Sequence, residues 1–442
     1  MRRAPLIVMI GLAAGAMPLA AQTTDSTQAS HGSYLFTLDQ CLQYAFGNSY
    51  ERQSLKLTEK SSDESINQAN SNRQPSVNAS AGENATHTGG DDNVVFNGNA
   101  GINASVNLYE GGSIKNTIAQ TKLQKENAEL KTAQYDNSLT IEILNTFLDA
   151  LKNGELLKYK TAIVATSKEQ AQQGKKKYAA GNLLESDYLV LKAQYTANQT
   201  DTLDAYISRN NSLLTLKKLM SMDADANLDI VYPDTTAMDG LALLPSQDDE
   251  VNKALQTMPE LKLDQKAIDI ARQSTEITRS GNRPTLTANA GIGTSHRDFD
   301  NFGQQLGDNF YQQVGINFSM PLYDRGQTKS KIAQNKYAEQ QAALDKQQDE
   351  LTIRQTVIEQ YQNVKLAYNR YKMAKEKCDA YKAVYDVYNV KFKMGAVVIT
   401  DLLQQQDNYI SAINDYIQAK YSFLLSRKIL DVYTGEAVSM KN

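Results

Sequence analysis

Side chains that could carry out chemistry are few in this sequence and lie far apart. It contains three histidines (His31, His87 and His296) and two cysteines (Cys41 and Cys378). Metal sites and reactive thiols need such residues in clusters or at short spacings, and these five form no such set. No phosphate-binding loop, dinucleotide fingerprint or nucleophile elbow occurs where a strand would meet a helix. The sequence therefore predicts a protein that is not an enzyme, has no cofactor or metal, and carries its histidines in solvated loops.

The N-terminal residues have the features of a secretory signal. Two arginines precede a short apolar run and a small-residue exit, which predicts a signal peptide over residues 1–21. Residues 22–36 are mostly polar and small, so a flexible leader is expected there. No later stretch approaches the ~20 apolar residues of a membrane-spanning helix. A net charge of −4 argues against a nucleic-acid-binding protein, which needs a basic surface.

One segment occurs twice in the chain. Gly101–Gln120 and Gly315–Gln334 share glycine, tyrosine and glutamine positions at a constant separation of 214 residues. In each copy apolar residues first occupy every second position, which is the period of a strand with two unlike faces. After Gly112 or Gly326 the sequence becomes polar and helical. The repeated unit is therefore an amphipathic strand, a glycine turn and a long helix, and such a repeat sets the architecture.

Matched features extend this unit to two repeats, 37–221 and 251–435, with a linker at 222–250 and a tail at 436–442. In the first repeat we expect strands near 75–84 and 98–108, a long helix at 113–180 and a return helix at 187–220. In the second we expect strands near 284–293 and 312–322, a long helix at 327–394 and a return helix at 401–433. The segments between paired strands are rich in Gly, Asp and Asn and are expected to be loops.

The long helices lack proline and would each span roughly 100 Å if continuous. Their length and polar character predict coiled coils. Each is followed by a glycine, Gly181 or Gly395, that can stop a helix in the left-handed conformation. Ser186 and Thr400 are expected to cap the return helices that follow.

Four strands of about ten residues have the length that crosses a tilted bilayer, but four cannot close a barrel. Open edges in lipid would leave backbone groups unpaired at several kcal/mol each. Two chains would supply eight strands and a filled pore, and three would supply twelve strands and a lumen. If the strands enter a membrane, an oligomer is therefore required. The alternative is a soluble four-stranded sheet.

These features together resemble the TolC-like outer membrane efflux family over essentially the whole mature chain. The resemblance rests on the doubled helix–hairpin–helix order, the proline before each first strand, and the turns at Leu108–Gly112 and Leu322–Gly326. It implies a mainly α fold with a β-barrel contribution: a homotrimer with one shared barrel in outer membrane lipid and a periplasmic coiled-coil tunnel. It also implies two partners, a periplasmic adaptor protein and an inner-membrane transporter, and no nucleic acid.

The family's helical tips can be carried over residue by residue. Adaptor docking is expected around the tip glycines, at Gly181, Leu183, Leu184, Ser186 and Asp187 and at Gly395, Val397, Val398 and Thr400. Asp401 matches an aspartate that narrows the closed periplasmic entrance of the trimer. A second family aspartate falls at Gln404, so this constriction differs here. Three carboxylates near an axis would repel one another and attract cations. An acid in a first helical turn also has a purely structural role, which we favour for Asp187 and leave as an equal alternative for Asp401.

The strand-to-helix turns carry Tyr109 with Gly112 and Tyr323 with Gly326. The chain has no tryptophan, so these tyrosines would supply an aromatic belt at the membrane surface, or else they pack within the turns. The expected function is a passive outer membrane exit duct of an efflux or type I secretion system. A periplasmic or surface coiled-coil protein without a pore is the alternative, although a spacer rod has no need of two amphipathic hairpins.

Overall fold

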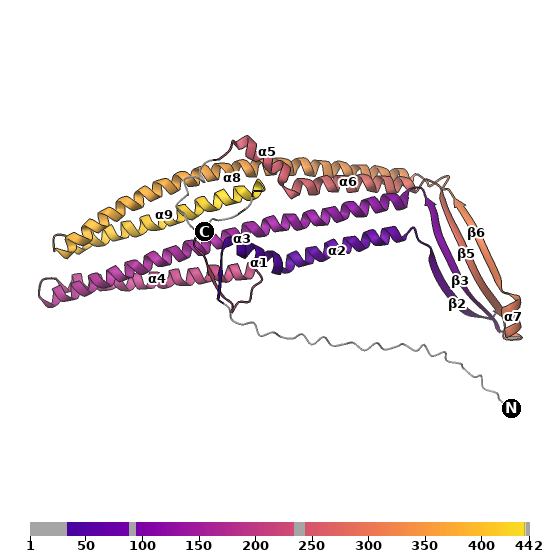
Figure 1. The fold of residues 1–442 in the computed structure, drawn as a ribbon, viewed down its shortest axis with the longest axis horizontal. Coiled ribbons are helices and arrows are strands. Elements are labelled where there is room, and N and C mark those ends of the chain that lie inside the picture. Colours follow the sequence, from indigo (N-terminus) through magenta and orange to yellow (C-terminus); the bar gives the residue numbers. More distant parts are fainter. Residues whose placement is uncertain (1–32, 88–93, 234–243, 437, 439–442) are drawn as a thin grey trace, which may run out of the picture.

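The computed structural model describes residues 33–87, 94–233, 244–436 and 438. The expected signal peptide, the leader before Ser33, with His31, and most of the tail lie outside these residues. The molecule is elongated, with a body of long helices and a curved sheet at one end (Figure 1). Within the described residues, no helix combines the length and the apolar character needed to cross a bilayer.

Among the described residues, the first repeat contains two short helices, two strands and two long helices. In order these are α1 (Leu38–Asn48), α2 (Tyr50–Ser71), β2 (Ser76–His87), β3 (Val94–Glu110), α3 (Ser113–Ala179) and α4 (Glu185–Leu219). The second half follows the same order with one added helix. Its elements are α5 (Gln247–Thr257), α6 (Pro259–Ser280), β5 (Thr285–Arg297), α7 (Phe302–Asp308), β6 (Tyr311–Ser319), α8 (Gln327–Lys393) and α9 (Ile399–Tyr433).

Two short strands correct the expectations for the leader and the linker. β1 (Ser33–Phe36) lies inside the expected flexible leader, and it pairs in parallel with β4 (Asn227–Ile230), inside the expected linker. Leu228 and Ile230 are buried in the core, which explains why this pairing forms. Four-residue strands are too short to show a period in the sequence. The linker also ends early, because α5 begins at Gln247.

The hairpins also differ from the expected pattern. β3 has 17 residues rather than about ten, so the first hairpin extends well beyond the length that a bilayer needs. The loop of the second hairpin contains α7, which was expected to be irregular. Asn301 enters α7 with a φ of 53°, a left-handed conformation that asparagine tolerates.

The sheet is antiparallel in the order β2-β3-β5-β6, so β3 and β5 join the two halves of the chain. Ile102 faces Ile292 and Ala104 faces Ala290 across this junction. These residues lie on one face of the sheet, together with the other apolar alternating positions. Asparagine, serine, threonine and glycine occupy the opposite face. The strands β2 and β6 form the two edges of this sheet.

The main core lies midway along the helical body. It is built from buried side chains of several helices, among them Phe147 of α3, Leu216 of α4, Val357 of α8 and Phe423 of α9. α3 packs along α4 and α8 packs along α9, while α2, α3, α6 and α8 run side by side toward the sheet (Figure 1). The fold is thus a long helical scaffold that separates the sheet from two helical tips.

Candidate functional site

The two helical hairpins end at the same side of the molecule, opposite the sheet (Figure 1). Both tips have the same backbone geometry. Gly181 and Gly395 adopt positive φ angles of 73° and 76°. After each glycine the next amide closes a turn, from Asn182 N to Lys177 O at 2.8 Å and from Ala396 N to Lys391 O at 2.9 Å. These bonds satisfy carbonyls that the helix ends would leave unpaired, so both glycines terminate their helices.

The return helices begin earlier than the sequence indicated, and the capping prediction was wrong. Their N-caps are Leu184 and Val398, and neither cap position makes a side-chain hydrogen bond. Ser186 and Thr400 are the second residues of these helices instead. The tight glycine turns bring the chain into helical geometry within three residues, which leaves the hydroxyls beyond the capping position.

The apolar tip residues separate into two kinds. Leu184 and Val398 project into solvent, with 70% and 61% of their surfaces exposed. Leu183 and Val397 pack inward against a small core that contains Leu191, Tyr385, Phe392, Ile399 and Leu402. Space around Gly181 and Gly395 is open, because no atom lies within 4 Å of where a Cβ would stand. Each tip therefore presents large apolar surface beside an accessible glycine turn, and Met394 adds to that of the second tip.

Asp187 and Asp401 both lie in the first turn of their helices. This is the position in which an acidic side chain stabilises the start of a helix. Asp401 and Gln404 are exposed and lie three residues apart, so they share one face of α9. Gln404 donates to Asn408 Oδ1 with a separation of 3.3 Å, which extends the same polar face. In the part of the chain that the structure describes, Asp401 forms no ion pair.

Contacts between the two hairpins are a feature that the sequence did not reveal. The buried Gln170 of α3 donates through Nε2 to Asn389 Oδ1 at 3.2 Å and to Tyr385 Oη at 3.3 Å. Burial raises the pKa of Tyr385, and the bond to Gln170 partly offsets this rise. A single glutamine in a long polar helix is not part of any periodic pattern. The role of Gln170 is therefore recognised only from its contacts in the folded protein.

A second contact closes the hairpins nearer to the tips. Lys177 Nζ of α3 donates to the carbonyl of Phe392 at 3.1 Å and lies 4.8 Å from the centre of its ring. Lys393 forms an ion pair of 3.2 Å with Glu169. Both links join α3 to α8, so the tips of the two halves are held together at several levels.

Each strand-to-helix turn contains a glycine whose backbone adopts the left-handed conformation. Gly112 and Gly326 immediately precede α3 and α8 with φ angles of 94° and 77°. In the second turn Asp324 accepts hydrogen bonds from Thr328 N and Gly326 N. Hydrogen bonding from the Thr328 side chain, together with these backbone bonds, holds the pKa of the Asp324 carboxyl below the usual range. Tyr109 and Tyr323 are exposed beside these turns, rather than packed within them. Exposed tyrosines are compatible with a position at a membrane surface.

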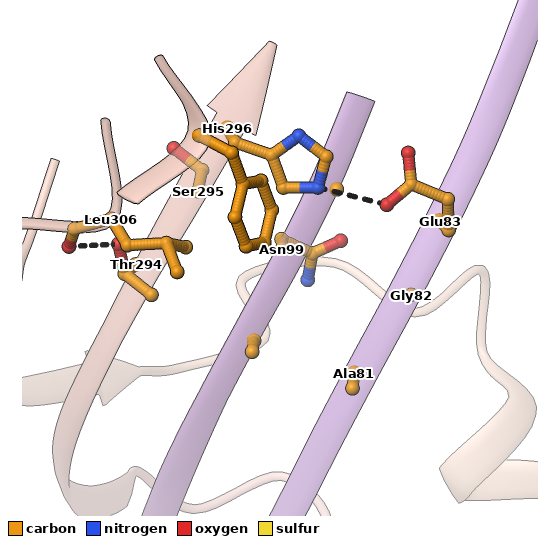
Figure 2. A pocket seen from close by; sticks show the side chains of 11 residues that line it. Ala81, Gly82, Glu83, Asn99, Thr294, Ser295, His296 and Leu306 are labelled. Atoms are coloured by element: carbon orange, nitrogen blue, oxygen red, sulfur yellow. Dashed lines mark hydrogen bonds and ion pairs between the residues drawn. The ribbon is translucent and has the colours of Figure 1, made fainter. Parts of the chain in front are cut away.

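Among the described residues, no group of three or more His, Cys, Asp or Glu side chains could hold a metal ion. Cys41 is buried and Cys378 is half-buried, and both are free thiols. His87 is exposed, as expected, but the expectation for His296 was wrong. His296 is only 8% exposed, and its Nε2 lies 2.9 Å from Glu83 Oε2 (Figure 2).

The arrangement of a sheet at one end and paired helical hairpins at the other is that of outer membrane channels. The solved structure of CusC, described as forming a transmembrane channel, superimposes with a TM-score of 0.77 at 12% identity, covering 92% of this chain and 94% of CusC. The family described as "Outer membrane efflux protein" matches residues 42–221 and 251–436, and the chain belongs to this family.

Sequence similarity to two further proteins supports this assignment. Outer membrane protein TolC of Vibrio cholerae is 22% identical over 393 residues, which cover 86% of this chain and 89% of the relative. The alkaline protease secretion protein AprF of Pseudomonas aeruginosa is 25% identical over 326 residues, covering 72% and 65%. The predicted resemblance is therefore confirmed. The protein is an outer membrane exit duct of the efflux and secretion class, with a large periplasmic part, and it is not an enzyme. Its family works with adaptor proteins and inner-membrane transporters.

Proposed function

We propose that three copies of this chain form one duct, with a shared barrel in the outer membrane and a helical tunnel in the periplasm. The observation that carries this proposal is the four-stranded sheet with two edge strands, β2 and β6. Every residue of β2 is exposed in the single chain. Since unpaired backbone groups are costly in lipid, pairing β2 of one copy with β6 of the next would close the sheet.

Exposed apolar side chains on the outermost long helices support the same assembly. Large apolar side chains remain exposed on α4 and α8, the helices at the two sides of the body. On α4 these include Leu189, Leu203 and Tyr206, and on α8 they include Leu344, Leu366 and Val387. Apolar surface on two long parallel edges favours side-by-side packing of further copies. A closed ring of three would cover both edges in every copy.

We assign adaptor docking to the two tips, at Gly181–Asp187 and Gly395–Thr400. Leu184 and Val398 would serve as the apolar anchors, because each projects beside an open glycine turn. Docking at both tips would place the adaptor around the periplasmic entrance, where the inner-membrane transporter delivers its cargo. The relative named for alkaline protease secretion supports a polypeptide as that cargo.

Asp401 is proposed to narrow the entrance of the trimer. Its carboxylate is exposed at the start of α9, on the same face as Gln404 and Asn408. Three such carboxylates around an axis would repel anions and concentrate cations. With Gln404 in place of a second acid, the constriction would carry one charged ring rather than two.

Planar-bilayer conductance of the purified oligomer tests this function. We expect a small, cation-preferring conductance for the unmodified protein, which rises and loses cation preference in Asp401→Ala. Asp187→Ala is the matched control, because it removes an acid from the corresponding first turn of the other hairpin. An unchanged conductance in Asp401→Ala would remove this residue from the entrance but keep the duct. Absence of any conductance, from protein that does not fractionate with outer membranes, would favour a coiled-coil protein without a pore.

A further inference from the structure

A cavity of about 530 Å³ lies at the outer end of the sheet, where α7 folds over the strands. The hydroxyl of Thr294 in β5 donates to the carbonyl of Leu306 at 2.6 Å, which fixes α7 against the sheet (Figure 2). Phe302 and Leu306 of α7 line the cavity on one side, and Ala81 and Ala100 line it from the strands. The small alanines leave room that larger side chains would fill.

A polar contact closes one end of this cavity. Glu83, Gly98 and His296 are neighbours across β2, β3 and β5. His296 Nε2 lies 2.9 Å from Glu83 Oε2, and the side chain reaches its partner across the intervening strand. A Cβ at Gly98 would overlap the imidazole, so this glycine is what allows the crossing. Nδ1 of His296 also lies 3.1 Å from the carbonyl of Asp298, which fixes the ring.

The cavity belongs to the apolar face of the sheet. Ala81 pairs with Ala100, which pairs with Thr294, and the next pairs along this face include Ile102 with Ile292. In the proposed duct this face contacts lipid, because transmembrane strands turn their apolar side outward. The cavity is therefore continuous with the lipid-facing surface. Its polar end lies toward the strand tips, near the membrane surface, and its alanine-lined side lies toward the bilayer interior.

We propose that this cavity binds one acyl chain of an outer membrane lipid. The chain would lie against Ala81, Ala100 and the side chains of α7. The exposed carboxylate of Glu83 would accept a hydrogen bond from a hydroxyl at the polar end of the same lipid, because both ring nitrogens of His296 already have partners. The inference rests on the proposed placement of the sheet in the membrane, and it adds a specific lipid site to that placement.

The chain has no tryptophan, which permits a direct test. Phe302→Trp places a single indole in the cavity wall and keeps an aromatic ring there. The detergent-solubilised oligomer is titrated with a phosphatidylcholine that carries bromine atoms on one acyl chain, which quenches tryptophan on contact. We expect quenching that saturates at one lipid per protomer.

Two variants fill the cavity, and one control leaves it open. Adding Ala81→Phe, or Ala100→Leu from the neighbouring strand, should raise the half-saturating lipid concentration at least tenfold. Ala79→Phe adds the same bulk on the same face, one pair further from α7 and outside the cavity, so it should leave the titration unchanged. Quenching that rises without saturation and is equal in all variants would overturn the site.

Conductance of the Phe302→Trp protein separates this inference from the proposed function. A conducting oligomer with no saturable quenching would reject the lipid site and retain the duct. A protein that shows neither conductance nor saturable quenching would reject both. Conductance together with saturable quenching that only the cavity-filling variants weaken is the result that we expect.

Discussion

Gln170 of α3 donates a hydrogen bond to the hydroxyl of Tyr385 of α8, although the two residues lie 215 positions apart in the chain. Tyr385 also stacks on Tyr409 of α9, with 5.5 Å between the ring centres. The three residues therefore connect the first helical hairpin to both helices of the second. A polar contact buried between two hairpins fixes their relative position, because separating them would leave its partners without hydrogen bonds.

Gln170→Ala should loosen the helical end of the duct. It removes both side-chain bonds to α8 and leaves the Tyr385 hydroxyl and Asn389 Oδ1 without that partner. We expect a stability loss of about 1–3 kcal/mol. We also expect a higher mean conductance in planar bilayers, since the hairpins would separate more often.

Gln173→Ala is the control for this change. Gln173 lies one turn further along α3, and within the described part of the chain its side chain bonds only to Glu169 of its own helix, at 3.0 Å. It should leave conductance unchanged. Equal conductance in Gln170→Ala and the unmodified protein would mean that the link between the hairpins does not restrict the entrance.

Glu250 of α5 should make stability depend on pH. Its side chain is 1% exposed, and burial raises the pKa of its carboxyl. The folded state therefore favours the protonated form. The stability that this form provides is present at low pH and is lost as pH rises from the usual glutamate range through the raised pKa.

Glu250→Gln should remove this loss. At pH 7–8 the variant should be more stable than the unmodified protein, and the two should converge at acidic pH. Thermal unfolding across this pH range measures the difference. Asp248→Asn, an exposed acid on the same helix, should show no such convergence. A Glu250→Gln protein that is less stable at every pH would show that the carboxylate has a favourable ionic role.

The strand-to-helix turns should respond unequally to the same substitution. Gly326 has a φ of 77°, and no atom lies within 4 Å of where an alanine methyl would stand, so Gly326→Ala carries only the backbone cost of about 1 kcal/mol. At Gly111 the φ is 61° and a Cβ would stand 2.5 Å from the carbonyl oxygen of Ser280. Gly111→Ala should therefore lower the melting temperature more than Gly326→Ala.

Gly47→Ala provides the opposite control for the turn variants. Gly47 lies inside α1, where a Cβ would meet nothing within 4 Å, and helical alanine is favoured over glycine. It should raise stability by about 0.5–1 kcal/mol. Equal losses at Gly111 and Gly326 would mean that the contact with Ser280 relaxes without cost.

Local signals account for most of the elements. Alternating residues such as Val314, Ile316 and Phe318 predicted β6, and the absence of proline predicted α3 and α8 to within a residue. The glycines at 181 and 395 predicted where the long helices end. These features depend on a few neighbouring residues, so they can be read without knowing the rest of the fold. The order and repetition of the same features also identified the family.

Contacts between segments far apart in the chain could not be predicted from the sequence, because they depend on how these segments pair and pack in the folded protein. The pairing of β1 with β4, the crossing of His296 over Gly98 to Glu83, and the bond from Gln170 to Tyr385 each join parts far apart in sequence. Neither member of such a pair shows a period or motif of its own. The strands, the glycine turns, the long helices and their repetition could all be predicted from the amino-acid sequence, because they follow from backbone preference and apolar spacing. Only packing determined which polar side chains meet, since burial leaves each of them few partners.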